Sequence, residues 1–188
     1  SNDWILFVDA DEVVTKGLEN EIVATINDDS ACEAYWFYRT FMFQDQRLRF
    51  SGWQTDKNHR LFKKSKVKYT DTKLVHETLE VDGNSCIFKE RLIHYCYKDF
   101  ADYRSKMLHY GRLKAKEAFY KEKSFNYFLL IFKPTWKFLH QYFIRLGFLD
   151  GKKGMIICYL NSLSVLERYR ELKRLEKKNE LAYYLVMP

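Results

Sequence analysis

The chain lacks several features that would place a protein in a broad class at once. Its four cysteines form no CxxC pair and no spacing typical of zinc ligands. No apolar run reaches the ~20 residues that a membrane-spanning helix needs, and the first residues do not resemble a signal peptide. No repeat or low-complexity segment is present. We therefore expect a cytoplasmic protein with reduced, mostly buried thiols, either soluble or lying on a membrane.

Size and charge narrow the classes further. The 188 residues suffice for one domain with a proper core, and we expect one folded unit with helical additions. The formal net charge is +7, and aromatic residues make up 18% of the chain. This balance favours anionic partners such as phosphates or an acidic membrane surface. Nucleic acid is not an expected partner, because the basic residues are spread along helices and no recognised binding module is present.

A run of apolar residues ends in a cluster of acids near the start of the chain. Residues 4–12 read WILFVDADE. The run predicts a buried parallel strand covered on both faces, with the acids at its carboxyl end. Side chains alternate along an extended chain, so Asp9 and Asp11 would point the same way and invite a divalent cation. A buried strand rarely opens a domain, so we expect the chain to be the carboxyl-terminal portion of something longer.

One helix and several short strands are expected to follow the acids. Thr15 can cap a helix whose Leu18, Ile22 and Ile26 recur at helical spacing. Aromatic strand formers at 34–43 and a turn back into 47–50 predict a hairpin. The Asp82-Gly83-Asn84 turn predicts a second hairpin between 79–81 and 86–88. Further strands are expected at 60–62 and 92–95.

The pattern becomes helical from Asp99 onward. Asp99 and Asp102 resemble a helix start of the capping-box kind, with Asp in place of the usual Glu. A second helical stretch, 125–146, contains Pro134, which predicts a break or kink near Lys133. A last helix is expected from Met155 to about Lys178.

The acidic motif admits several interpretations from its residues alone. A calcium loop of the EF-hand type fails, because Val14 stands at the glycine position and Asn20 at the final acidic position. The acids could instead cap the following helix and face solvent. A phosphatase of the haloacid dehalogenase type is a third interpretation, with Asp9 as nucleophile and Asp11 as acid and base. Such an enzyme also needs a second acidic pair on a later strand to complete its magnesium site. Only Asp99 and Asp102 offer such a pair.

A fourth interpretation rests on the order of motifs along nearly the whole chain. The chain strongly resembles the family 2 inverting glycosyltransferases of GT-A fold, closest to the bacterial branch that builds lipopolysaccharide core and other surface glycans. The motifs that carry this resemblance are WILFVDADE, Gly52-Trp53, Asp56, Arg60-Leu61-Phe62, Val75-His76-Glu77, Leu92-Ile93-His94 and Leu149-Asp150-Gly151 with Gly154. The family normally has a nucleotide-binding strand and loop before the acids, and this chain has none.

The resemblance implies a fold and a domain organisation. The expected class is α/β: a truncated GT-A core, Rossmann-like with a mixed sheet in three layers, followed by a C-terminal helical extension. Residues 1–98 would form the metal-binding and acceptor-binding side of the catalytic domain. Residues 99–188 would form the extension, packed on the core or on a membrane surface.

The resemblance also implies roles for single residues. Mn²⁺ or Mg²⁺ would be held by Asp11, with Asp9 and His94 as further contacts, while Asp9 could instead contact the ribose. Glu77 would be the catalytic base, with Asp56 as second candidate, and Asp11, His94 and Glu77 would meet in one cleft. The alternative for His94 is a buried, hydrogen-bonded histidine at a strand end. Structural salt bridges are the alternative for Glu77 and for Arg60, which would pair with Asp56 or otherwise bind diphosphate or acceptor oxygens. Gly52 and Trp53 would bind the acceptor, unless Trp53 belongs to the core.

The apolar and basic stretch 125–146 suggests a location at a membrane surface. Lys133, Lys137 and Arg145 interrupt its apolar residues, which argues for a helix lying in the headgroup layer. The expected partners are a nucleotide sugar, a glycan or lipid-linked acceptor, and the cytoplasmic face of the inner membrane. A helix packed on the core or against a second copy in a homodimer, and a non-enzymatic membrane-surface module, remain open alternatives.

Overall fold

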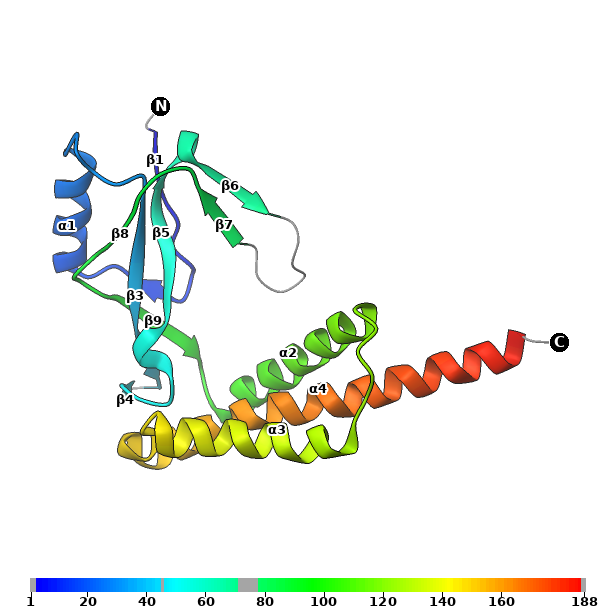
Figure 1. Ribbon diagram of the computed structural model, residues 1–188. Helices are drawn as coiled ribbons and strands as arrows, with labels where there is room; N and C mark the ends of the chain where they lie inside the picture. The colour runs from blue at the N-terminus through cyan, green and yellow to red at the C-terminus, as the bar shows by residue number, and fades with distance from the viewer. Residues whose placement is uncertain (1–2, 45, 71–77, 187–188) are drawn as a thin grey trace. The chain divides into compact units, whose positions relative to one another are not determined.

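A computed structural model describes residues 3–44, 46–70 and 78–186. The chain divides into two compact units, Ser1–Lys98 and Asp99–Pro188, and each is described by itself. The first unit is a mixed α/β structure and the second is helical (Figure 1). The expected α/β class with a mixed sheet and a C-terminal helical extension is therefore confirmed.

Within its described residues, the first unit is built on a sheet of seven strands. Its order is β1-β5-β3-β9-β2, with β4 and β8 also paired to β3, while β6 and β7 form a separate ribbon. The central β3 runs antiparallel to β4 and β5 and parallel to β8 and β9. The elements are β1 Trp4–Leu6, β2 Glu12–Val13, α1 Lys16–Ile26, β3 Ala34–Phe43, β4 Gln46–Leu48, β5 Lys57–Lys63, β6 Val67–Thr70, β7 Thr78–Val81, β8 Ser85–Ile87 and β9 Leu92–Tyr97, with 3₁₀ turns at Trp53–Thr55 and Lys64–Lys66.

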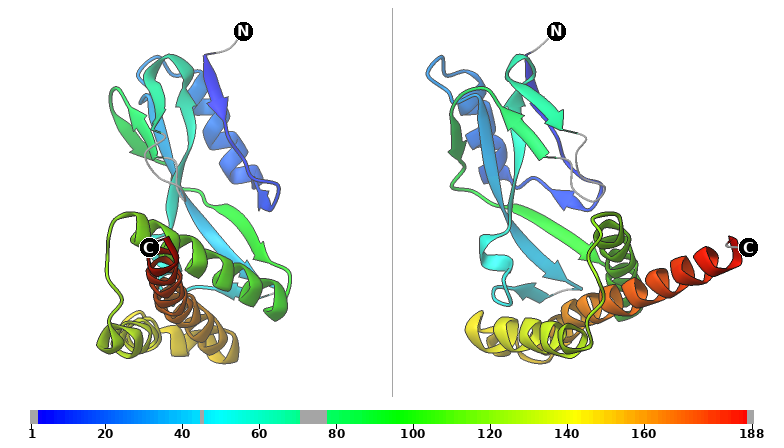
Figure 2. Two further views of the ribbon diagram at one scale, coloured as in Figure 1. Left: turned by 90° about the vertical axis from the view of Figure 1, so that its right-hand side faces the viewer. Right: turned by 45° about the vertical axis from the view of Figure 1, so that its right-hand side comes forward.

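Helix α1 covers one face of this sheet (Figure 2). As predicted, Thr15 caps it, because its hydroxyl oxygen accepts a hydrogen bond from the Leu18 amide at 3.2 Å. Leu18 and Ile22 are buried in the core, whereas Ile26 is exposed. Their core partners in the sheet and its connections are Ala31, Tyr35, Phe37, Leu61, Phe88 and Leu92.

Several expectations for this unit are wrong. Strand β1 pairs antiparallel with β5 at the end of the strand order, and Leu6, Phe7 and Val8 are exposed, so it is not a buried parallel strand. The described part of the unit has one α-helix, which gives two layers and not three. Cys32 and Cys86 form a disulfide, so these two thiols are not reduced.

The first predicted hairpin is confirmed and the second is wrong. Strands β3 and β4 pair across the expected turn. Residues 79–81 instead pair with β6, and 86–87 pair with β3. The turn residue Asn84 is held by Glu33: the Asn84 amide donates to the Glu33 carboxylate at 2.8 Å, and the Glu33 amide donates to the Asn84 carbonyl at 3.0 Å. These two hydrogen bonds hold the turn where the chain leaves the β6–β7 pair and joins β3 as strand β8.

The described part of the second unit has three α-helices, of which the last packs against the other two. They are α2 Phe100–Tyr120, α3 Tyr127–Leu139 and α4 Gly151–Val186, with a π-helix at His140–Ile144 and a 3₁₀ turn at Gly147–Asp150 between the last two. Asp99 caps α2 through the Asp102 amide, as predicted. Helix α4 packs against α2 and α3 and then extends beyond them (Figure 1).

Helix α3 has no break near Lys133, so this part of the predicted break or kink is wrong. Helix α3 continues through Pro134, which is buried, and the irregular segment follows it as the π-helix. There the Arg145 amide donates to the His140 carbonyl at 2.8 Å, the spacing of a π-turn. The last helix also begins earlier and ends later than the expected 155–178.

Candidate functional site

The acidic motif forms a tight turn that leads from β1 to β2. The Glu12 amide donates to the Asp9 carbonyl at 3.0 Å, and the Asp9 amide donates to the Glu12 carboxylate at 3.0 Å. The chain is therefore not extended between Asp9 and Asp11, and the two carboxylates do not point the same way as expected. Asp9 faces Arg60, whereas Asp11 faces His94.

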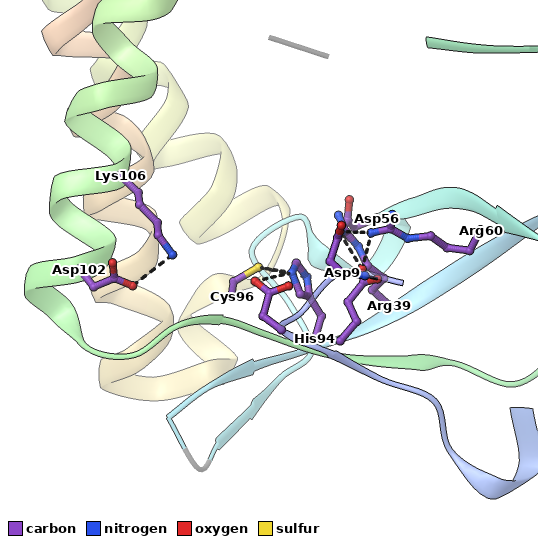
Figure 3. A network of polar contacts seen from close by, with 10 residues as sticks. Asp9, Arg39, Asp56, Arg60, His94, Cys96, Asp102 and Lys106 are labelled. Carbon is purple, nitrogen blue, oxygen red and sulfur yellow. Dashed lines mark hydrogen bonds and ion pairs between the residues drawn. The ribbon is translucent and has the colours of Figure 1, made fainter. Parts of the chain in front are cut away.

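A network of two arginines and three carboxylates supports this turn (Figure 3). The Glu12 carboxylate is fully buried, with Oε1 2.5 Å from Arg60 Nη2 and 3.4 Å from Arg39 Nη1. Arg60 also forms an ion pair with Asp9. Arg39 donates to Asp56 Oδ2 through Nε at 2.8 Å and lies within 2.6 Å of it through Nη2. Each buried charge therefore has an opposite charge beside it.

Asp11 and His94 meet although they lie far apart in the sequence. Asp11 Oδ2 is 3.5 Å from His94 Nε2, and the Tyr95 amide donates to the Asp11 carbonyl at 2.8 Å. The register of β2 with β9, which pairs Glu12 with His94, brings them together. The Asp11 side chain is 43% exposed, while His94 is buried. A solvent-facing carboxylate thus stands beside a buried imidazole.

The surroundings of His94 favour its neutral form. Burial, together with the Arg39 guanidinium, lowers the pKa of His94 below its usual value, while Asp11 acts in the opposite direction. A neutral imidazole has a nitrogen lone pair available for a metal or a proton. Cys96 lies against the same ring, with Sγ 3.0 Å from Nδ1 (Figure 3). Sequence reasoning missed Cys96, because the expected strand ended at residue 95, whereas β9 continues to Tyr97 and places Cys96 on the same side as His94.

Gly52 and Trp53 lie on a loop that packs against the core strand β3. The Trp53 ring stacks on Phe41 with ring centroids 3.8 Å apart, and Phe41 is buried. Phe41 in turn meets the His94 ring edge-on at 6.2 Å. Gly52 has a φ of 99°, which glycine adopts without strain. The predicted acceptor loop is thus connected to the His94 region through one aromatic residue.

Two further predicted groups are the base candidate Glu77 and the acidic pair Asp99 and Asp102. Glu77 and its neighbour His76 lie outside the described residues. Asp99 and Asp102 both serve the start of α2, Asp99 as its cap and Asp102 beside Lys106 at 3.3 Å. The two acids that the phosphatase interpretation would need for its metal site thus stabilise the start of α2 instead.

Asp11 and His94 are suitable ligands for a metal ion but would not complete its coordination. Among the described residues, no group of three or more His, Cys, Asp and Glu side chains is arranged to bind an ion by itself. Asp11 and His94 supply one carboxylate oxygen and one imidazole nitrogen. Mg²⁺ and similar ions are often held by one or two protein ligands together with substrate phosphates and water. Asp9 is directed to Arg60 and would have to leave that ion pair to contact such an ion.

Comparison with known proteins finds relatives across almost the whole chain. An uncharacterized glycosyltransferase of Rickettsia typhi is 27% identical over 190 residues, covering 95% of this chain and 64% of its own length. A Rickettsia conorii protein of the same description is 28% identical, covering 96% of this chain and 68% of its own length. The chain therefore spans about two thirds of the length of these curated relatives. No family model and no solved structure matches it.

Proposed function

We propose that the chain carries the metal-binding and acceptor-binding part of an inverting, nucleotide-sugar-dependent glycosyltransferase of family 2 and GT-A fold. The observation that carries the proposal is the Asp11 carboxylate beside the His94 imidazole, with Arg60 held nearby by Glu12. The names of the rickettsial relatives support the transferase part. The donor class, the inversion and the metal are our inference from the site and the resemblance.

The reaction determines what the site must do. An acceptor hydroxyl oxygen forms a bond to the anomeric carbon while the bond from that carbon to the diphosphate oxygen breaks. The bonding electrons leave with the nucleoside diphosphate, and the hydroxyl proton passes to a base. Attack from the face opposite the leaving group inverts the anomeric carbon. The site must therefore stabilise negative charge on the diphosphate and accept a proton.

The arginine cluster suits the first task. Arg60 presents a planar guanidinium of the kind that binds phosphate oxygens in pairs, and its Nε is buried with no hydrogen-bond partner among the described residues. Glu12 fixes the guanidinium from its buried side. We infer that diphosphate displaces Asp9 from Arg60, because the Asp9 side chain is 42% exposed and solvent could receive its carboxylate.

The excess of carboxylates suits a divalent cation. Asp9, Asp11, Glu12 and Asp56 outnumber Arg39 and Arg60 by two charges. Asp11 and His94 would hold Mn²⁺ or Mg²⁺, with the imidazole favouring manganese. When bound, the ion supplies charge neutralisation at the departing diphosphate.

Glu77 remains the proposed base, and Asp56 takes another role. Arg39 makes two close contacts to the same Asp56 oxygen, so we propose that Asp56 orients that arginine. Trp53 stacks on Phe41 with one ring face, so an acceptor sugar would use its edge or its other face together with Gly52. A glycan or a lipid-linked saccharide on a bacterial surface-glycan pathway fits this assignment.

The decisive experiment measures nucleoside diphosphate release by the full-length protein from a panel of nucleotide sugars with Mn²⁺. We expect release to fall about a hundredfold or more in Asp11→Asn, because a ligand to the leaving-group ion is lost. Asp28→Asn, on the exposed turn after α1, is the matched control and should retain activity. Mn²⁺ binding, measured by electron paramagnetic resonance, should weaken in the first variant alone. Equal activity in both variants would overturn the proposal.

The same protein tests the two competing interpretations. Trapping of beryllium fluoride on Asp9 would indicate the phosphatase, although the Arg60 ion pair and the use of Asp99 and Asp102 at a helix start disfavour it. Absence of any turnover, with unchanged folding in Asp11→Asn, would indicate that the acids are structural.

A further inference from the structure

Helix α3 carries an apolar surface that its own unit does not cover. Six residues at helical spacing form this surface, which we call the α3 ridge: Phe128, Ile131, Phe132, Thr135, Trp136 and Leu139. All but Thr135 are large and apolar, and their exposure ranges from 41% to 71%. The aromatic rings follow one another along the ridge, with centroids of Phe128 and Phe132 5.2 Å apart. Such a patch usually marks an interaction site.

The opposite face of α3 holds the helix in place. Leu130, Pro134 and Phe138, with Ile131 and Thr135 at the border of the ridge, line a groove of about 610 Å³ shared with α4, where Tyr159 and Leu166 lie. At the start of α3, Lys173 of α4 donates to the Tyr127 hydroxyl at 2.8 Å. The Glu176 carboxylate of α4 accepts from the Phe125 amide at 2.5 Å. The helix is therefore anchored to α4 at its start, while Phe128, Phe132, Trp136 and Leu139 of the ridge lie outside the groove shared with α4.

The segment of the chain that contains the ridge carries charge of one sign. The segment 123–149 contains no Asp or Glu, whereas it contains Lys123, Lys133, Lys137 and Arg145. Burial lowers the pKa of Lys137, but Lys133 is exposed on the flank of the helix. An apolar stripe flanked by basic residues attracts an anionic surface into which apolar side chains can insert.

We propose that the α3 ridge inserts into the headgroup layer of an anionic lipid bilayer. Phenylalanine, isoleucine and tryptophan side chains would enter the acyl boundary, and Lys133 would contact lipid phosphates. None of the described helices has the length and apolar character to cross a bilayer, so the helix would lie in the plane of the surface. A second copy of the chain fits this surface less well. A two-fold interface would bring the same acid-free basic segments together.

The test uses vesicles and the intact protein. We expect co-sedimentation with phosphatidylcholine vesicles that contain phosphatidylglycerol, weaker binding to phosphatidylcholine alone, and loss of binding as salt is raised. Ile131→Ser combined with Phe128→Ser should reduce partitioning about tenfold or more, because burial of apolar area supplies the binding energy. Tyr120→Ser, which changes an exposed aromatic residue of α2, is the matched control and should bind as the parent does.

A second measurement distinguishes insertion from a change in folding. Brominated lipids should quench tryptophan fluorescence in the parent, and Trp136→Phe should lose this quenching while it still sediments with vesicles. Lys133→Glu should weaken binding to anionic vesicles and leave the circular dichroism spectrum unchanged. Equal vesicle binding by the ridge variants and the control would overturn the proposal. So would lipid-independent dimerisation that the ridge substitutions abolish, because the ridge would then be an interface between copies.

Discussion

Glu12 Oε1 lies 2.5 Å from Arg60 Nη2, and both side chains are almost completely buried. Glu12 belongs to the acidic turn after β1, while Arg60 comes from the middle of β5. A buried carboxylate with 0% exposure survives only where opposite charges compensate its desolvation. Arg39 supplies a second such charge from β3. Glu12 thus connects the acidic turn to two strands of the sheet, β3 and β5. Because Asp11 precedes Glu12 in this turn, these ion pairs also help to hold Asp11 in place.

Replacing Glu12 should therefore destabilise the chain strongly. Glu12→Gln leaves Arg60 and Arg39 without their shared buried carboxylate, and we expect the free energy of unfolding to fall by about 3 kcal/mol or more. Glu19→Gln is the control, because Glu19 pairs with Lys16 on an exposed face and such pairs contribute less than about 1 kcal/mol. Urea denaturation measures both values. Equal stability of the two variants would show that the buried network contributes little.

Local signals in the sequence were sufficient for the caps and the first hairpin. Thr15 and Asp99 hydrogen-bond to amides three residues ahead, an interaction that depends on the segment itself. The aromatic run of β3 and the turn into β4 are equally local. The resemblance added the pairing of Asp11 with His94, which no local pattern contains. Here a long-range contact was expected because of the order of motifs.

Long-range competition accounts for the errors. The Asp82-Gly83-Asn84 signal predicts a turn but cannot reveal that Glu33 captures Asn84 and redirects the strand that follows. An apolar run predicts burial without saying what covers it, and Phe7 is 48% exposed in the described structure. The importance of Glu12 was likewise hidden, since its burial depends on arginines that lie 27 and 48 residues away.

Gly111 tests the packing of the second unit. Helix propensity alone would make Gly111→Ala stabilising by up to about 1 kcal/mol. A Cβ at this position would, however, lie 2.6 Å from the Ser164 carbonyl oxygen and 2.9 Å from the Glu167 Cβ on α4. Overpacking should win, and we expect a loss of about 1–3 kcal/mol in the free energy of unfolding. Thermal denaturation followed by circular dichroism measures the sign.

Gly17→Ala in α1 provides the control for Gly111→Ala. Its Cβ would meet the Glu90 side chain at 3.1 Å, and the end of a flexible glutamate can move. The propensity gain should therefore persist, and this variant should be as stable as the parent or more so. If Gly111→Ala also raised the melting temperature, α2 and α4 would not approach as closely as described.

His59 should make the stability of the first unit depend on pH. Its ring stacks on Trp36 with centroids 3.5 Å apart, and Nε2 lies 3.2 Å from the Ser85 hydroxyl. Burial, and secondly the charge of Lys57, lowers the pKa of His59 in the folded state below the usual value of 6.5. As the pH falls, the unfolded chain therefore takes up this proton first. The contribution of His59 is fully present above about pH 6.5 and is lost as the pH falls through the lower folded value.

The variant His59→Gln should weaken this dependence. Between about pH 7.5 and pH 5.5, which brackets the ordinary histidine pKa, the free energy of unfolding should fall less in His59→Gln than in the parent. Lys57→Gln removes the second cause and should lie between the two, because burial continues to disfavour the imidazolium. Urea denaturation at a series of pH values gives each slope. Identical slopes for His59→Gln and the parent would mean that the imidazole has the same pKa in the folded and unfolded chains. The stacking on Trp36 and the nearby ammonium group of Lys57 argue against that outcome.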